Sequence, residues 1–235
     1  MEIINCPDPL YSPPKPYYTA DFNNYLILHH TVLTSAQEYH LEQESILVYV
    51  ESGHGRVAIN GVVFPVEPGC VCLLQTYHAY RFSSAKNDTL HLRVLILDYP
   101  LLGAISYRVP DPHQIAAAMD QMPIVRCSPD GQREFLSVFQ KFEKVQENSS
   151  LQNALMKVSL CGQLRVLYAR ESRKSDPLTF SFPPGWWAWP YITKFCTKNI
   201  TATDVAAEVG VTVPQLNREL RRVSGYDFRH LLTRA

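Results

Sequence analysis

The residues of this sequence best suited to specific chemistry are the polar and basic side chains of the helix predicted at 214–223. At helical spacing, Leu216, Leu220 and Val223 share one face, which predicts its packing side. Amide and guanidinium groups occupy the other face, and such groups hydrogen-bond to bases and phosphates in a DNA major groove. The candidate DNA-contacting residues are Gln215, Asn217, Arg218, Arg221 and Arg222.

The residues before this helix predict how it is held. An apolar helical face around Val205 ends at Gly210, and a glycine there can take the left-handed conformation that a tight turn requires. Thr212 can then cap a new helix, with Gln215 completing a capping box. This pattern favours a helix-turn-helix that reads DNA through helix 214–223. A helical hairpin with a solvated basic face is the alternative.

A second group of candidates lies in the N-terminal half of the chain. On the strand predicted at 78–82, alternation puts His78, Tyr80 and Phe82 on one face. If that face looks inward, it offers an imidazole, a phenol and a phenyl ring. A largely apolar site with a few polar groups suits a small organic effector, with sugars among the candidates. The candidate effector-binding residues are His40, Tyr49, His78 and Tyr80.

The elements that must position these residues change type along the chain. Residues 25–98 read as seven short strands separated by turns, which is typical of a sandwich or small barrel. The pair Asn60-Gly61 predicts a type I′ hairpin, because both central residues of that turn need positive φ. Helices are predicted at 114–121, 132–146, 151–170, 187–198, 203–209, 215–223 and 228–234. The fold class is therefore α+β.

Two features of the helical half admit more than one use. The helix at 151–170 carries an apolar stripe that includes Leu151, Leu155 and Leu164, and it can pack on its own barrel or pair two subunits. Trp186, Trp187 and Trp189 follow the Pro- and Ser-rich stretch 175–185, which reads as a linker. We expect these tryptophans to pack the small C-terminal domain. Stacking on bases and clamping a ligand are the alternatives.

Composition and charge limit the class of protein. The 235 residues carry 22 basic and 22 acidic side chains, with an acidic first half and a basic second half. No apolar run is long enough to span a membrane, and the first residues lack a secretory signal pattern. The six cysteines form no CxxC pair, so we expect reduced thiols in a cytoplasmic protein without a structural zinc site.

A longer pattern of apolar, glycine and polar positions surrounds the helix predicted at 214–223. It consists of Ile200, Asp204, Val205, Ala206, Gly210, Val211, Thr212, Val213, Pro214, Leu216, Leu220, Arg221, Gly225, Phe228, Leu231 and Leu232. With this pattern, the C-terminal residues resemble the first half of the DNA-binding domain of the AraC/XylS family of transcription regulators.

The resemblance implies that Asn217 and Arg218 face base edges and that Arg221 and Arg222 lie nearer the DNA backbone. In that family, two helix-turn-helix units are joined by a long helix. This sequence ends at Ala235, inside the expected joining helix, so we expect a truncated regulator that binds its operator weakly. A natural half-regulator is the alternative.

Residues 20–98 are similar, more loosely, to the cupin-type β-barrel that forms the effector domain of the same family. The carrying stretches are 46–53, 66–69, 73–74 and 78–80. The resemblance implies a ligand-responsive transcription regulator that forms a homodimer. We therefore divide the chain into an N-terminal arm (1–19), a cupin-like effector-binding barrel (20–110), a helical connecting and dimerisation segment (111–174), a linker (175–185) and a partial helix-turn-helix domain (186–235).

Two other functions remain open at this stage. Metal-dependent cupin enzymes look like the same barrel and bind their metal through a His-x-His pair, a Glu and a later His. Here His40 and Glu42 stand near the first pair and His78 matches the last ligand, but Ile46 occupies the carboxylate position. We therefore expect no metal, no cofactor and no catalytic residue. A sensor or dimer-forming protein without tight DNA binding is the third possibility.

Overall fold

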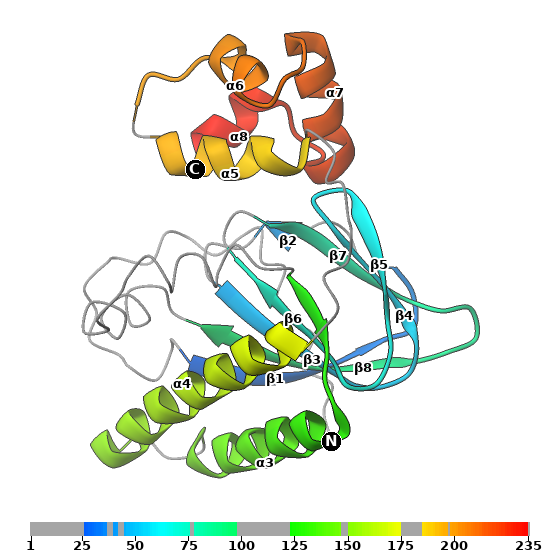
Figure 1. The fold of residues 1–235 in the computed structure, drawn as a ribbon, viewed down its shortest axis with the longest axis vertical. Helices are drawn as coiled ribbons and strands as arrows, with labels where there is room; N and C mark the ends of the chain where they lie inside the picture. Colours follow the sequence, from blue (N-terminus) through cyan, green and yellow to red (C-terminus); the bar gives the residue numbers. More distant parts are fainter. Residues whose placement is uncertain are drawn as a thin grey trace.

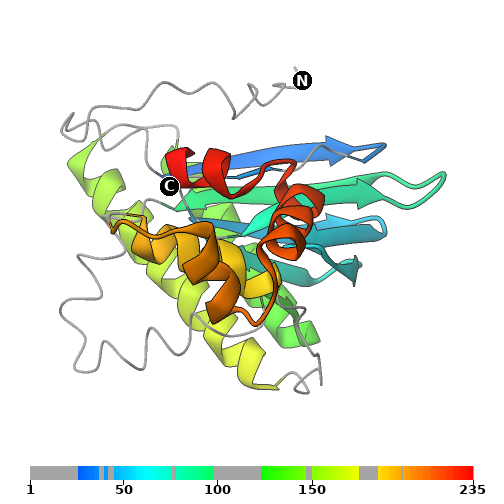
Figure 2. The same cartoon turned by 90° about the horizontal axis from the view of Figure 1, so that it is seen from above.

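The computed structural model of this chain describes residues 26–36, 40–41, 45–75, 78–97, 123–146, 150–174, 185–196 and 198–234. Within these residues, two antiparallel sheets and two long helices form one domain, and a C-terminal helical unit of residues 185–234 lies beyond one end of the strands (Figure 1). Figure 2 shows the same unit from above. None of the helices in this part of the chain combines the length and the apolar character that crossing a membrane requires.

The strands form a five-stranded sheet of order β1-β8-β3-β6-β9 and a four-stranded sheet of order β2-β7-β4-β5, all with antiparallel neighbours. They are β1 (Leu26–Leu33), β2 (His40–Leu41), β3 (Ser45–Ser52), β4 (Gly55–Ile59), β5 (Val62–Val66), β6 (Cys70–Leu74), β7 (Ala79–Ser84), β8 (Leu90–Leu97) and β9 (Ile124–Arg126). The helices are α3 (Pro129–Gln146), α4 (Leu151–Lys174), α5 (Gly185–Phe195), α6 (Ala202–Glu208), α7 (Val213–Ser224) and α8 (Phe228–Arg234).

The five-stranded sheet separates two hydrophobic cores. Along β3, Ile46, Val48 and Val50 point into an inner core, where they meet side chains of β4, β5 and β7 from the other sheet. Leu47 and Tyr49 point the other way, into an outer core shared with α3 and α4. Because successive side chains of a strand alternate between faces, both faces of this sheet are buried. The sheet is thus the middle layer of the domain.

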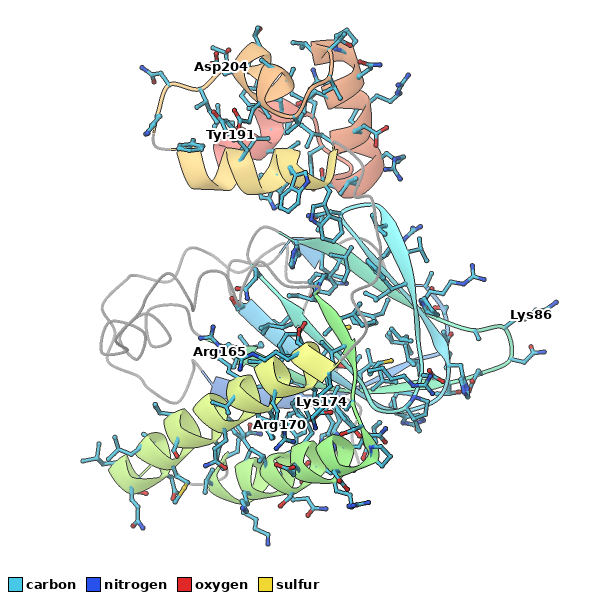
Figure 3. All side chains as sticks on the ribbon, in the orientation of Figure 1. Lys86, Arg165, Arg170, Lys174, Tyr191 and Asp204 are labelled. Carbon is cyan, nitrogen blue, oxygen red and sulfur yellow. The ribbon has the colours of Figure 1, made fainter. Side chains whose placement is uncertain are left out.

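Helices α3 and α4 cover the outer face of the five-stranded sheet (Figure 1). Phe139 of α3 and Leu164 of α4 are fully buried in the outer core. Near the end of α4, Arg170 pairs with Glu134 of α3 at 2.8 Å, and Figure 3 shows Arg170 on the side of α4 toward α3. Of the two uses open for helix 151–170, packing on its own barrel is therefore realised by the C-terminal part of the helix.

The predicted apolar stripe of that helix divides between two environments. Its first part is exposed: Leu151 and Leu155 keep 76% and 63% of their surface accessible, and Met156 is exposed beside them. Val166, in the second part, is exposed as well. Leu164 and Leu167 of the second part are buried. A helix whose N-terminal half presents several large apolar side chains to solvent has a free apolar patch.

Two short strands were not predicted from the sequence. Residues 124–126, inside the segment expected to be helical, form β9 and add to the edge of the five-stranded sheet beside β6. His40 and Leu41 form β2, which pairs with β7 so that His40 lies opposite Tyr80. Runs of two or three residues are too short to show a period, and only the open edge of a neighbouring strand decides their conformation.

The predicted turn between β4 and β5 is confirmed. Asn60 and Gly61 have φ of 43° and 79°, as a type I′ hairpin requires. A side chain at position 61 would also lack room, because a Cβ there would stand 2.7 Å from Nη2 of Arg222. The hairpin tip therefore contacts the C-terminal helical unit directly.

Several predictions fall on residues outside the described ones. These are the N-terminal arm at 1–19, the helix at 114–121 and residues 175–184 of the expected linker. Among the described cysteines, Cys70, Cys72, Cys127, Cys161 and Cys196 are all free thiols, in line with the expectation of reduced cysteines.

We expect removal of a buried ring between α3 and the sheet to unfold the domain readily. Phe139→Ala deletes a fully buried phenyl ring that contacts Tyr49, and such truncations cost about 3–5 kcal/mol. Urea unfolding followed by circular dichroism measures this loss. The matched control is Gln140→Ala, at an exposed neighbouring position of the same helix. Equal free energies of unfolding for the two variants would contradict the layered packing described here.

Candidate functional site

The end of the barrel nearest the C-terminal helical unit gathers three of the four candidate effector-binding residues. His40 of β2 stacks on Tyr80 of β7, with ring centroids 5.5 Å apart and planes 26° apart. Tyr80 also meets the edge of Phe82, and both belong to the inner core. Tyr80 and Phe82 therefore share one face of β7, as predicted. His78, the third residue of the predicted face, lies outside the strand.

His78 lies just before β7 and is buried, with 5% of its surface exposed. Its Nδ1 accepts a hydrogen bond from the backbone N–H of Gln75 at 3.1 Å, so the neutral ring carries its proton on Nε2. Burial lowers the pKa of His78 to about 3. The ring of Trp186 approaches it with centroids 5.8 Å apart. His78 is thus an uncharged group at the barrel end.

Tyr49 lies away from these residues. Its ring is in the outer core, stacked on Phe135 of α3 with centroids 6.1 Å apart and tilted against Phe139 at 5.8 Å. Burial raises the pKa of Tyr49 to about 12. The expectation that Tyr49 shares an effector site with His40, His78 and Tyr80 is therefore not met by the geometry. Both faces of β3 are apolar in sequence, so alternation alone could not tell which one looks inward.

The positions that would hold a cupin metal ion are only partly among the described residues. His40 and His78 are described, whereas Glu42 lies outside the described part of the chain. Within that part, no three His, Cys, Asp or Glu side chains gather as ligands of a metal ion would. Ile46, at the expected carboxylate position, is buried in the inner core.

The C-terminal helical unit has its own core around Trp189, Ile192, Leu216 and Leu220. Figure 3 shows Tyr191 of α5 pointing into this unit, where it packs against the same core. The core holds α5, α6, α7 and α8 together. The apolar face predicted for helix 214–223 is therefore the face that packs.

The turn between α6 and α7 has the local geometry that the sequence predicts. Gly210 has a φ of 71°, and Thr212 caps α7 in a capping box with Gln215. The backbone N–H of Thr212 donates to Oε1 of Gln215 at 2.9 Å. A second capping box, between Thr201 and Asp204, begins α6 and escaped the sequence analysis. Its signal was present as a Thr-x-x-Asp pattern.

The five candidate DNA-contacting residues differ in what their side chains already bind. Gln215 is occupied by the capping box, and Oδ1 of Asn217 accepts the backbone N–H of Phe228 at 3.0 Å. Because an asparagine reads adenine with both its oxygen and its nitrogen, the bond to Phe228 opposes the expected base contact of Asn217. Arg221 pairs with Asp227 at 2.9 Å.

Arg222 and Arg218 differ most in the number of partners that their guanidinium groups bind. Arg222 pairs with Glu219 at 2.8 Å, and its Nη1 donates to the carbonyl oxygen of Gly61 at 3.3 Å. Arg218 is exposed, and among the described residues no hydrogen bond or ion pair engages its guanidinium. Exposed ion pairs contribute little free energy, so Arg221 can exchange its partner for a phosphate at small cost. Arg218 needs no exchange.

Asn60 at the barrel end was missed as a functional candidate, and for Trp186 ligand clamping was only an alternative to packing. Asn60 is fully buried; its Oδ1 accepts the N–H of Ala79 at 2.8 Å, and its Nδ2 donates to the carbonyl oxygen of Trp186 at 3.3 Å. Trp186 itself was assigned to the packing of the C-terminal domain. No local pattern signals a contact between residues 126 positions apart, so the sequence could not place either residue at this site.

Comparison with known families identifies the class of this protein. The AraC-like ligand binding domain family matches residues 29–176, which is more than half of the chain. The chain therefore belongs to the AraC-like ligand-binding domain family, as the sequence resemblance predicted. The match covers both sheets together with α3 and α4.

Two solved structures are among those found to be similar to this chain. Vibrio cholerae ToxT bound to an unsaturated fatty acid is 13% identical, with a TM-score of 0.44 over 89% of this chain and 77% of that chain. The AraC-like transcriptional activator CuxR is 14% identical, with a TM-score of 0.46 over 90% of this chain and 76% of that chain. A search of curated proteins finds no match.

We expect burial of His78 to make the protein less stable in mild acid. An unfolded chain binds a proton at His78 near pH 6.5, whereas the folded ring resists it down to about pH 3. Stability from this residue is therefore complete above the unfolded pKa and is lost as the pH falls below it. Between about pH 7.5 and about pH 5, the free energy of unfolding should fall by about 2 kcal/mol through this residue.

Urea unfolding at these two pH values measures the effect. From the higher to the lower pH, the free energy of unfolding of His78→Gln should fall by about 2 kcal/mol less than that of the unmodified chain. The matched control is His91→Gln, because His91 is exposed on β8. If the unmodified chain and His78→Gln show the same pH dependence, His78 is not held neutral by burial.

Proposed function

We propose that this protein is a ligand-responsive transcription regulator that binds DNA through α7. The observation that carries the proposal is the AraC-like ligand-binding domain at residues 29–176, followed by a helical unit with a capped, basic α7. The barrel binds a small organic effector, sugars among the candidates, near His40, His78 and Tyr80. We assign the barrel no reaction, and the proposed role implies a cytoplasmic protein.

In this proposal the helix-turn-helix is formed by α6 and α7. Arg218 makes the principal base contact, because it is exposed and has no partner among the described residues. Arg221 and Arg222 contact phosphates after leaving Asp227 and Glu219. Gln215 and Asn217 orient the helix and the start of α8 through the bonds described above. Binding by one such unit is weak and depends on salt.

Selection of duplexes from a randomised DNA library at low salt tests the proposal. We expect enrichment of a defined sequence, and Arg218→Ala to weaken binding to it by about 1–3 kcal/mol, or about 5- to 150-fold. The reason is the loss of a bidentate contact to guanine. Fluorescence anisotropy with the selected duplex measures the change.

The matched control for this test is Arg229→Ala. It removes the same charge from an exposed position of α8, outside the proposed reading helix. It should reduce binding only through the general charge effect, equally for selected and unselected duplexes. Absence of an enriched sequence, or equal losses for both arginine variants, would rule out reading by α7.

We further propose that two copies of the chain pair through the exposed apolar patch of α4. The patch consists of Leu151, Leu155 and Met156 in the first turns of that helix, and Val166 is exposed further along it. Burying such side chains against a second copy removes apolar surface from water, which favours association. Pairing would also bring together two weakly binding α7 helices, which strengthens DNA binding without new contacts.

A charge placed in this patch should separate the copies. We expect Leu155→Glu to be monomeric at concentrations where the unmodified chain is dimeric, because a buried unpaired carboxylate is costly. Sedimentation velocity measures the masses. Gln140→Glu adds the same charge at an exposed site of α3 and should remain dimeric. A dimer in all three proteins would show that another surface pairs them.

A further inference from the structure

Trp186 connects the two parts of the molecule in an unexpected way. It belongs to α5 of the C-terminal helical unit, yet its side chain lies in the inner core of the barrel and is 4% exposed. Two residues later, Ala188 belongs to the core of the helical unit, as does Trp189. One turn of α5 therefore places side chains in two different hydrophobic cores.

The surroundings of Trp186 have the character of a ligand site. The imidazole of His78 tilts against the indole at 50°, with centroids 5.8 Å apart. Asn60, fully buried at the hairpin, donates from Nδ2 to the carbonyl oxygen of Trp186. Tyr80, on which His40 stacks, belongs to the same inner core as Trp186. The side chains of Asn60 and His78 are planar, polar at defined points and, because burial lowers the pKa of His78, uncharged.

The same hairpin also holds α7. Arg222 of α7 donates to the carbonyl oxygen of Gly61, the residue that follows Asn60 in the turn. The absence of a side chain at Gly61 allows this approach, since a Cβ there would meet Arg222 and Val223 at under 3.0 Å. Seating of Trp186 and docking of α7 thus depend on adjacent residues of one turn.

We propose that Trp186 occupies the place of the effector's ring, and that the barrel end is a site for an uncharged, planar aromatic molecule that competes with Trp186. This inference rests on the proposed effector-binding function and narrows the effector from small organic molecules in general to aromatic ones. A ligand that binds only when Trp186 has left shifts the population toward a released helical unit. If DNA binds α7 better when the helical unit is released, the ligand strengthens DNA binding by some factor. By linkage, DNA then strengthens ligand binding by that same factor.

Indole tests this proposal, because it is the ring of the Trp186 side chain without the Cβ methylene and the backbone. In the full chain, Trp186→Ala should bind one indole per chain, at least about tenfold more tightly than the unmodified protein. Titration calorimetry measures the affinities. Trp187→Ala, which removes the exposed neighbouring indole, is the matched control and should bind indole as weakly as the unmodified chain. Trp186→Phe keeps a ring in the site and should also exclude indole.

Hydrogen exchange of the unmodified chain gives an independent readout. Saturating indole should speed amide exchange in the peptides that cover residues 185–192 and 59–62, because Trp186 leaves and the hairpin loses its partners. Failure of Trp186→Ala to bind indole while it remains folded would overturn the proposal. If that variant unfolds, unchanged exchange in the unmodified chain at saturating indole would overturn it instead. Either failure leaves the DNA-selection result untouched, so the two proposals are separable.

Discussion

Strand β3 has buried side chains on both of its faces, and the rest of the ligand-binding domain is arranged to cover them. Val48 and its alternate neighbours need the four-stranded sheet on one side, while Leu47 and Tyr49 need α3 and α4 on the other. A strand of this kind cannot be stable in an open sheet, because either uncovered face would expose a row of large apolar side chains. The two helices are therefore a layer of this domain, and the family match that continues to residue 176 agrees with that boundary.

The barrel end is organised by a different principle. Its buried polar side chains carry no charge: Asn60 accepts the backbone N–H of Ala79, and His78 accepts that of Gln75. Ser45 donates to the side-chain oxygen of Gln75 at 2.7 Å, which extends the arrangement to the start of β3. Buried polar groups of this sort fix a single geometry, because the folded state is destabilised when any of them is left without its hydrogen-bond partner. That end is consequently well suited to respond to a molecule that replaces one partner.

The polar side chains of helix α7 divide between local structure and exposed positions. Gln215 begins the helix and Asn217 positions the next one, while Arg218 keeps its side chain exposed. Arg221 and Arg222 hold acidic partners that are themselves near the surface. Pairing of this kind neutralises part of the basic surface within the protein. Among the five candidates on α7, the exposed guanidinium of Arg218 therefore differs from those of Arg221 and Arg222.

Much of this protein was determined by its sequence through interactions between near neighbours. Positive φ at Asn60 and Gly210, the cap formed by Thr212 and the alternation along the strands follow from φ/ψ preferences and spacing within a few residues. The same local signals, with the family resemblance, indicated the type of effector domain before any tertiary information.

Only the tertiary structure decided which face of each element meets which layer. It put Tyr49 in the outer core, seated Trp186 in the barrel and gave Asn217 a partner eleven residues along the chain. It also made a strand of residues 124–126, which carry too few residues to specify one. The physical reason is common to all four: burial and pairing depend on groups that the chain brings together from distant positions, and local periodicity contains no information about that choice.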